Sequence, residues 1–300
     1  MFKPIYMISF LTINYNGFSD TCDLIDSIKN KVFSVDYEII VVDNGSLNNE
    51  YDRLNLKYTD IKVVRSDKNL GFAGGNNLGI KFAVGDFIFF INNDTLIKKD
   101  NISDFLKIFE VSDSIGAISP KIKFAYEPMN LQFAGFTVLS SITLRNSQIG
   151  NNLPDNKIYD KKMEIPYVHG AAFVIKREVL AKVGLMPDMY FLYYEELDWS
   201  ERIKDGGYTL WYNPILTIYH KESQSTGYNS PLQAYYLTRN RMVFAYRNLK
   251  NLNRYLSLSY LMFIATPKDL IKNLFKRKLN LVFSVLRGAR DFVIHINKWK

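Results

Sequence analysis

The sequence contains little cysteine and no long apolar segment. Its single cysteine, Cys22, excludes an internal disulfide and is typical of proteins from a reducing compartment. No run of about eighteen apolar residues occurs, which argues against a transmembrane helix. Residues 1–15 are apolar but short, and they lack the small-residue cleavage site of a signal peptide, so we expect a buried first strand there.

Basic charge is concentrated in the last fifth of the chain. Residues 241–300 hold 13 lysines and arginines against 2 acidic residues, whereas the first 240 residues have a slight acidic excess. Apolar residues recur at helical spacing among these charges from Lys268 onwards. This basic amphipathic pattern suits an anionic membrane surface, and it is equally compatible with a helical cap whose basic face is solvated. We expect no nucleic-acid binding, because only the charge would support it and no recognition motif is present.

The first hundred residues alternate between predicted strands and helices. Apolar runs that end in polar residues predict strands over 5–13, 38–43, 62–65 and 87–91, and helical spacing predicts helices over 20–30 and 76–84. This alternation is typical of a parallel, doubly wound α/β sheet, in which ligands bind at the carboxyl ends of the strands.

The later part of the chain has a looser pattern. Strands are predicted over 115–122 and 170–175, and helices over 102–109, 177–183 and 195–206. Residues 127–165 are rich in loop-forming residues, and the chain beyond Tyr228 is predicted to be mainly helical.

Three polar residues, Asn14, Asp43 and Asp94, fall at the predicted carboxyl ends of strands. A carboxylate such as Asp94 can hold a hard cation there and leave coordination positions for phosphate oxygens and water. Asp43 can accept a hydrogen bond from a base or a ribose. Each residue also has an ordinary interpretation, because Asn and Asp favour the turns that follow strands.

Residues 69–77 form a glycine-rich stretch just before the helix predicted over 76–84. Glycines there would let backbone N–H groups approach an anionic ligand at the start of the helix. The spacing matches neither the dinucleotide fingerprint nor a P-loop. A plain flexible turn is the alternative.

The densest acidic cluster is Glu195, Glu196 and Asp198, which follows the aromatic run 190–194. Two adjacent glutamates beside apolar surface repel each other, which raises the pKa of one of them and suits it to general-base catalysis. Solvated acids at the start of a helix are the alternative. His220, taken alone, is more often a structural histidine than a ligand.

The order of these motifs resembles glycosyltransferase family 2, and within it the bacterial rhamnosyltransferase-like enzymes of surface polysaccharide synthesis. The resemblance covers about residues 5–245. It is carried by short blocks in family order, which are Thr12–Asn16, Val42–Ser46, Asn69–Asn77, Asn92–Thr95, His169–Ala172, Tyr194–Asp198, His220 with Ser225, Tyr235–Tyr236 and Arg239–Asn240.

The resemblance implies a GT-A fold, a nucleotide-diphospho-sugar transferase fold with a Rossmann-like mixed sheet flanked by helices. Residues 1–227 would be the catalytic domain, with a nucleotide-sugar-binding half (1–98) and an acceptor-binding half (99–227). Residues 228–300 would be a helical, basic amphipathic extension that contacts the membrane.

The resemblance also implies a donor pocket and a metal site. Asp94 matches the last position of the family's Asp-x-Asp metal motif, and Asn92 replaces its first aspartate, which leaves fewer charged ligands. His220 matches a position that reaches the same metal in related enzymes, and the ion would be Mn²⁺ or Mg²⁺, with imidazole favouring Mn²⁺. The remaining residues of the expected nucleotide-sugar pocket are Thr12, Asn14, Tyr15, Asp43, Asn69, Gly74, Asn77, Asn92 and Asn93.

Glu196 occupies the place of the family's catalytic base, usually an aspartate, and Glu195 is the alternative base. The acceptor side would include His169, Gly170, Asp198 and Trp199, with Asp198 supporting either the helix start or the acceptor. The resemblance implies inverting transfer from a uridine or thymidine diphosphate sugar, rhamnose among the candidates, to a glycan or lipid-linked acceptor of surface polysaccharide such as lipopolysaccharide O-antigen. The enzyme would work on the cytoplasmic face of the inner membrane.

Two other functions deserve comparison. A nucleotidyltransferase shares the α/β sheet, the metal and the nucleotide, but it would carry a basic glycine-rich loop near the N-terminus, and residues 12–17 hold no basic residue. A non-catalytic sugar-binding relative is less consistent with the presence of Asp43, Asp94, Glu196 and His220 together.

Overall fold

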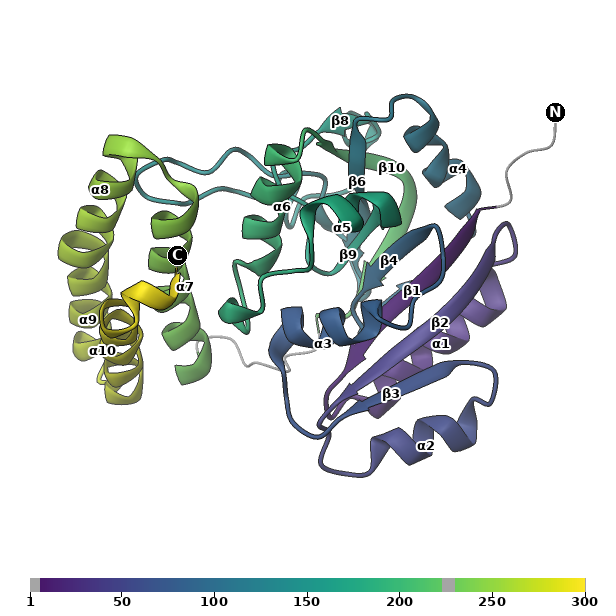
Figure 1. Ribbon diagram of the computed structural model, residues 1–300, viewed down its shortest axis with the longest axis horizontal. Coiled ribbons are helices and arrows are strands. Elements are labelled where there is room, and N and C mark those ends of the chain that lie inside the picture. Colours follow the sequence, from purple (N-terminus) through teal and green to yellow (C-terminus); the bar gives the residue numbers. More distant parts are fainter. Residues whose placement is uncertain (1–5, 223–229, 300) are drawn as a thin grey trace.

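A computed structural model describes residues 6–222 and 230–299. Ser225 and the expected domain boundary at 227/228 therefore lie outside the described residues, as does the start of the first predicted strand at Ile5. The described chain forms one mixed sheet flanked by helices, followed by a group of C-terminal helices at one end (Figure 1).

Four parallel strands make the first half of the sheet. They are β1 (Met7–Asn14), β2 (Asp36–Asn44), β3 (Lys62–Ser66) and β4 (Phe87–Ile91), in the spatial order β3-β2-β1-β4. The apolar runs of β1, β2 and β4 are mostly buried because helices cover the sheet, as the alternating pattern predicted, whereas the edge strand β3 is partly exposed. The connecting helices are α1 (Phe18–Lys31), α2 (Glu50–Lys57) and α3 (Gly71–Ile80).

Antiparallel pairing enters in the second half, which makes the sheet mixed. β9 (Ala172–Lys176) runs antiparallel to both β4 and β6 (Ile115–Phe124), and β10 (Thr209–His220) runs parallel to β6. Three short strands complete the ten-stranded sheet, namely β5 (Thr95–Ile97) and β8 (Met163–Glu164) on β10, and β7 (Leu131–Phe133) on β6. The helices and turns of this half are α4 (Ile102–Leu106), η1 (Lys107–Glu110), η2 (Lys157–Tyr159), α5 (Arg177–Val183), η3 (Asp188–Tyr190) and α6 (Glu195–Asp205).

The glycine-rich stretch differs from its prediction. The helix expected over 76–84 begins at Gly71 and ends at Ile80, so most of the stretch is helix rather than a loop before one. A Cβ on Gly75 would lie 2.9 Å from the Ile13 side chain, and one on Gly79 would collide with Leu11. These glycines therefore let α3 pack closely on β1 and β2, a tertiary requirement that local helix propensity does not reveal.

The C-terminal region is helical, as predicted. Its elements are α7 (Pro231–Asn248), α8 (Asn251–Tyr260), the π-helical turn η4 (Leu261–Ala265), α9 (Thr266–Phe275), α10 (Leu279–Ile294) and η5 (Ile296–Trp299). The Ser230 hydroxyl caps α7 by accepting a hydrogen bond from the Gln233 N–H, with Pro231 in the first turn. We call residues 231–299 the helical unit. Phe244, Phe292 and Trp299 form part of a small core of the helical unit, which also includes Tyr190 from η3.

Candidate active site

The carboxyl ends of β1 and β2 hold a buried polar network. Asn14 lies opposite Asp43 in the parallel register, and its amide nitrogen donates to Asp43 Oδ1 at 3.2 Å and to Glu50 Oε2 at 2.8 Å. Its amide oxygen accepts from the Thr21 hydroxyl at 2.7 Å. Asn14 therefore orients its neighbours, with both ends of its amide engaged inside the protein.

Two buried oxygens near these strand ends, Thr12 Oγ1 and Asp43 Oδ2, have no hydrogen-bond partner within the described residues. Asp43 is 1% exposed and its Oδ2 atom has no hydrogen bond within the described residues, and neither does the hydroxyl of Thr12. A buried polar atom without a partner carries a desolvation cost that a ligand donor can offset. Tyr15, which follows β1, is 41% exposed. Asp43 Oδ2 can accept a hydrogen bond from a base or ribose, and Tyr15 can lie against it.

The loop before α3 is stabilised by two asparagines, Asn44 and Asn69, of which Asn69 belongs to the expected donor pocket. Asn44 Oδ1 accepts from the Leu70 N–H at 3.0 Å, and Asn69 Oδ1 accepts from the Gly71 N–H at 2.8 Å. Gly71 has a positive φ of 74°, and its neighbour Phe72 donates its N–H to the Phe191 carbonyl at 2.8 Å. The loop that starts α3 is thereby joined to the aromatic run near the glutamates.

Gly74 and Asn77 lie on α3 itself. A Cβ on Gly74 would be 2.8 Å from the Leu70 side chain. The Asn77 side chain exchanges two hydrogen bonds with the backbone of Met186, at 2.8 and 3.0 Å. Asn77 thus links α3 to the segment just before η3. This structural role is compatible with a donor pocket alongside the helix.

Asp94 and His220 are brought together by strands that are far apart in sequence. β5 pairs with the end of β10, so that Thr95 lies opposite His220, and Asp94 Oδ1 lies 3.1 Å from His220 Nε2. Both residues are 7% exposed. On the other side of the ring, His220 Nδ1 lies 2.8 Å from Gln132 Oε1. Gln132, on β7, was not predicted, because no local pattern marks it and only the β6–β7 pairing places it there.

Asn92 and Asn93 shape the turn that carries Asp94. The Asn92 carbonyl accepts from the Thr95 backbone and hydroxyl, and its N–H donates to the Ala171 carbonyl at 2.9 Å. The Asn93 amide donates to the Thr21 hydroxyl at 3.0 Å. Through Asn93 and Thr21 this turn lies next to Asn14, so the predicted strand-end residues Asn14, Asp43 and Asp94 lie at one edge of the sheet.

The Asp94–His220 pair fits a divalent cation. Two ligands at right angles, each about 2.1 Å from an ion, are about 3 Å apart, which is the separation observed. Gln132 Oε1 can accept the Nδ1 proton and leave Nε2 free to bind metal, the usual outer arrangement of a metal-binding histidine. The described residues contain no group of three or more His, Cys, Asp or Glu that could hold an ion. A cation here would thus need oxygens from the substrate as well, and carboxylate with imidazole suits Mn²⁺.

Glu195 and Glu196 begin α6 in different environments. Glu195 is 2% exposed, and its Oε2 atom has no partner within the described residues. Burial, with a further contribution from the charge of Glu196, raises the pKa of Glu195 well above its usual range. Glu196 is partly exposed, and burial raises its pKa to about 7. Of the two, Glu196 is the better general base near neutral pH.

The segment before these glutamates has an unusual backbone. Phe191, Tyr193 and Tyr194 have positive φ angles of 65°, 69° and 78°. Such angles cost energy in non-glycine residues and persist where the surroundings hold them. The Asn240 amide on α7 donates to the carbonyls of Leu192 and Tyr193 at 2.7 and 2.9 Å. Asn240 and its neighbour Arg239 were quoted only for the family resemblance, and the structure shows that they hold the backbone of the segment before Glu195.

His169 and Gly170 lie between the Asp94–His220 pair and Glu196. A Cβ on Gly170 would be 3.8 Å from the Glu196 carboxyl group. Burial, with a smaller contribution from the charge of His220, lowers the pKa of His169 to about 3, so this ring stays neutral. Its Nδ1 atom accepts from the Ala171 N–H at 3.1 Å. Gly170 therefore leaves space beside Glu196 that a side chain would fill.

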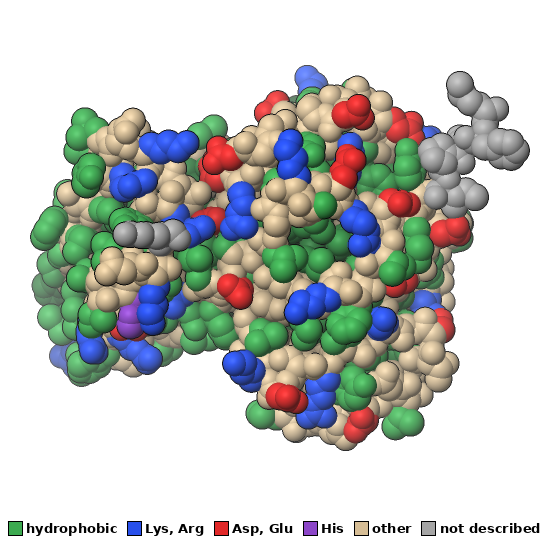
Figure 2. All heavy atoms as spheres, in the orientation of Figure 1, with side chains coloured by type: hydrophobic (Ala, Val, Ile, Leu, Met, Phe, Trp, Pro, Cys, Tyr) green, Lys and Arg blue, Asp and Glu red, His purple; other side chains and the backbone are tan. Residues whose placement is uncertain are grey.

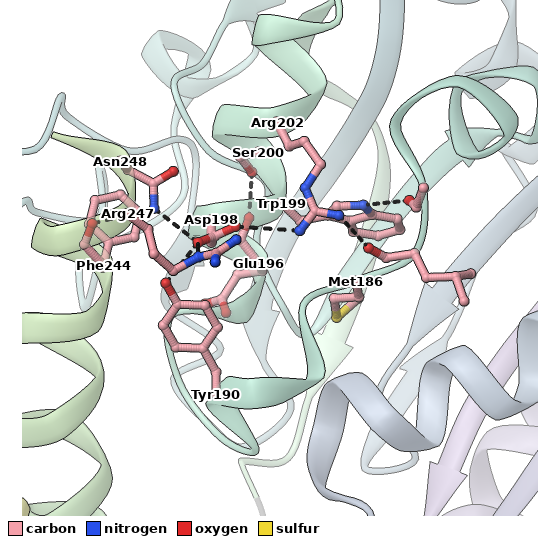
Figure 3. Close-up of polar contacts among 12 residues, drawn as sticks. Met186, Tyr190, Glu196, Asp198, Trp199, Ser200, Arg202, Phe244, Arg247 and Asn248 are labelled. Carbon is pink, nitrogen blue, oxygen red and sulfur yellow. Dashed lines mark hydrogen bonds and ion pairs between the residues drawn. The ribbon is translucent and has the colours of Figure 1, made fainter. Parts of the chain in front are cut away.

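Asp198 anchors the helical unit to α6 (Figure 3). Its Oδ2 atom accepts hydrogen bonds from the Tyr190 hydroxyl at 2.7 Å, Arg247 Nε at 2.8 Å and the Asn248 amide at 2.9 Å. Trp199 is fully buried against Phe90 and donates its indole N–H to the Gly184 carbonyl. Trp199 therefore lies in the core rather than on a surface where an acceptor would bind.

Comparison with known proteins gives a consistent result. The pattern of the family described as Glycosyl transferase family 2 matches residues 9–184. The chain is 25% identical over 295 residues to the low-salt glycan biosynthesis hexosyltransferase Agl10 of Haloferax volcanii, covering 94% of this chain and 89% of that protein. It is 20% identical over 211 residues to an N-acetylglucosaminyl-diphospho-decaprenol L-rhamnosyltransferase of Mycobacterium tuberculosis, covering 63% of this chain and 68% of that protein.

Solved structures share the fold. GalNAc-T7 with UDP, GalNAc and Mn²⁺ superposes with a TM-score of 0.63 at 16% identity, over 88% of this chain and 57% of that one. The mannosyltransferase PcManGT of Pyrobaculum calidifontis, in complex with GDP-Man and Mn²⁺, gives 0.57 at 16% identity, over 96% and 75%. The mixed sheet and C-terminal helices are thus a GT-A fold, as the resemblance implied. The family match covers more than half of the sequence, and the chain is a glycosyltransferase that belongs to glycosyl transferase family 2.

Proposed function

We propose that this glycosyltransferase transfers a sugar with inversion from a uridine or thymidine diphosphate donor to a lipid-linked glycan. The observation that carries the mechanism is the position of residues 169 and 170. The His169 ring lies 4.8 Å from that of Phe133, the neighbour of the Gln132 that contacts His220, and Gly170 adjoins Glu196. A metal-bound leaving group and a base can therefore act on one bound sugar.

The reaction is a single displacement. Glu196 removes the proton from an acceptor hydroxyl, whose oxygen forms a bond to the anomeric carbon while the bond from that carbon to the diphosphate oxygen breaks. The nucleoside diphosphate leaves with the electron pair, and one displacement inverts the anomeric configuration. A cation held by Asp94 and His220 would stabilise the charge on the leaving diphosphate. Asp43 and Tyr15 would hold the nucleoside, in line with the unpartnered Asp43 oxygen.

A thermal-shift screen can identify the donor. We expect one nucleotide sugar among uridine, thymidine and guanosine diphosphate sugars to raise the melting temperature by several degrees at saturation, about 2–3 kcal/mol of stabilisation, and only with Mn²⁺ or Mg²⁺. Nucleoside diphosphate should then be released when acceptor is added. Release of inorganic pyrophosphate would instead indicate a nucleotidyltransferase, and the absence of any metal-dependent shift would contradict the proposed donor site.

The lipid-linked acceptor and the membrane location are supported by the surface of the helical unit. None of the described helices is long and apolar enough to span a membrane. The helical unit nevertheless exposes large apolar side chains among its basic residues (Figure 2). Those exposed by half or more are Leu252, Tyr255, Phe263, Ile264, Ile271, Leu274, Phe275, Leu279, Phe283 and Ile294. Contiguous apolar surface with positive charge fits an anionic membrane on the side where the enzyme works.

The helical unit is also a cap on the catalytic domain, so both interpretations of the basic tail apply. Because Phe292 and Trp299 pack into the core beside α7, deleting residues 268–300 would remove part of that core as well as the membrane surface. Point substitutions on the exposed face test membrane binding more cleanly.

Replacing Phe263, Phe275 and Phe283 together with serine is expected to abolish sedimentation with phosphatidylglycerol vesicles. These rings are 75%, 85% and 68% exposed, so the melting temperature should hardly change. Each buried phenylalanine contributes about 1.5–3 kcal/mol to partitioning, so the combined loss in vesicle affinity should exceed about a hundredfold. Phe33→Ser is the matched control, because Phe33 is 82% exposed on the nucleotide half. Equal vesicle binding by the triple variant would rule out this membrane surface.

A further inference from the structure

A cavity lies next to Glu195 and Glu196, between the catalytic domain and the helical unit. It has a volume of about 270 Å³, and its wall includes Tyr194, which directly precedes Glu195. The opposite wall comes from α7, η4 and the first turn of α9. The loop 137–147 closes one side, where Ser257 on α8 donates to the Ile142 carbonyl at 2.9 Å. Figure 1 shows this long loop reaching across to the helical unit.

Two arginines, Arg145 and Arg241, line the cavity, and neither makes an ion pair with a carboxylate within the described residues. Arg241 on α7 donates from Nε to the Thr143 carbonyl at 3.0 Å. Arg145 is exposed, and its guanidinium makes no hydrogen bond or ion pair within residues 6–222 and 230–299. Asp269 also lines the cavity and its charge acts on Arg241, but it makes no ion pair with either arginine within the described residues. Burial lowers the pKa of Arg241, and the charge of Arg145 adds to this effect, so the two cations repel each other across the cavity.

The cavity faces the reaction centre on one side and apolar surface on the other. The Tyr194 hydroxyl lies within electrostatic range of Arg241, Glu196 and Arg145. Leu261 and Ala265 line the cavity, and the intervening Phe263 and Ile264 on the same helical turn are 75% and 56% exposed. A ligand with an anionic group and an apolar chain matches both surfaces.

We infer that Arg145 and Arg241 bind the diphosphate of an isoprenoid-linked acceptor, with the first isoprene units against Leu261 and Ala265. This inference rests on the proposed function, because it places the acceptor sugar between the diphosphate and Glu196. Guanidinium groups are suited to phosphate oxygens, which they bind through two parallel hydrogen bonds. The rest of the lipid chain leaves the cavity along the exposed apolar face of the helical unit.

Calorimetry with farnesyl diphosphate tests this site on the full chain. The titration contains a chelator, so that diphosphate cannot bind through a metal at Asp94. We expect Arg145→Gln to weaken farnesyl diphosphate binding about tenfold and Arg145→Glu about a hundredfold or more. Because the Arg145 side chain is exposed and its guanidinium makes no hydrogen bond or ion pair within the described residues, the melting temperature should stay constant. Arg241→Lys keeps the charge and should weaken binding less than Arg145→Glu.

Three probes and one control variant separate the alternatives. Inorganic pyrophosphate should bind more weakly than farnesyl diphosphate, and farnesol should bind with no dependence on Arg145. Lys272→Gln removes one exposed charge from α9 outside the cavity and should leave farnesyl diphosphate affinity unchanged. Equal farnesyl diphosphate affinity in Arg145→Glu and the natural protein would overturn the inference. Pyrophosphate binding as tight as that of farnesyl diphosphate would overturn its isoprenoid part.

Donor binding distinguishes this inference from the proposed function. Mn²⁺-dependent binding of the preferred nucleotide sugar should be unchanged in Arg145→Gln. If it were lost, the arginines would serve the donor diphosphate, and the acceptor site would be wrong while the sugar-transfer function stood. If no nucleotide sugar bound at all, the proposed donor site would fail, and the farnesyl diphosphate titration would still be interpretable.

Discussion

Glu196→Gln is expected to lower kcat by about 10²- to 10⁴-fold while leaving donor affinity nearly unchanged. Glutamine has the shape of glutamate but cannot take the proton of the attacking hydroxyl. The carboxyl group lies beside Gly170 rather than in the network around Asp43, so its loss should spare the nucleotide. Steady-state transfer and separate calorimetry of donor binding measure the two effects.

The same residue should determine the pH dependence. Because burial raises the pKa of Glu196 to about 7, the ionised form that accepts a proton is lost as the pH falls below 7. We expect kcat/KM to rise with pH through about 7 and then level off, whereas an unperturbed glutamate would already be ionised at about pH 5. The matched variant is Glu195→Gln, which changes the neighbouring buried carboxyl group at the start of the same helix. Near-normal turnover of Glu196→Gln, with loss of turnover in Glu195→Gln, would assign the base to Glu195.

Asp94→Ala is expected to abolish the metal dependence of donor binding. Asp94 supplies the carboxylate of a two-residue site, so without it His220 would be the remaining protein ligand identified for the cation. We expect donor affinity in Mn²⁺ to fall about a hundredfold or more, to the value measured with chelator. Calorimetry with and without Mn²⁺ gives this result, and electron paramagnetic resonance of free Mn²⁺ reports metal binding without any turnover.

The control for this variant is Asp113→Ala, which removes an exposed carboxylate from the turn before β6, at the opposite end of that strand from His220. It should keep full metal-dependent donor binding. Persistence of that binding in Asp94→Ala would remove Asp94 from the metal site and leave the Asp94–His220 pair as an ordinary hydrogen bond.

Predictions from the sequence were most accurate where residues act through local pattern. The apolar runs predicted β1, β2 and β4, with Asn14, Asp43 and Ile91 at or next to their carboxyl ends. The alternation of strands and helices predicted that these ends meet at one edge of the sheet. The glycine-rich stretch was interpreted less well, because Gly75 is needed for close packing on Ile13 rather than for a loop. Packing of this kind depends on the partner surface, which has no local signal.

The sequence by itself determined the family, the strand-end carboxylates and the acidic pair at the start of α6, since each depends on short patterns in a known order. Only the tertiary structure decided which groups act together. It brought His220 into contact with Asp94, which lies 126 residues earlier in the chain, and placed Gln132 on the other side of the imidazole. It also left Glu196 partly exposed while burying Glu195. These pairings and the resulting pKa values depend on distance and burial, and both arise only when separate strands and helices pack together.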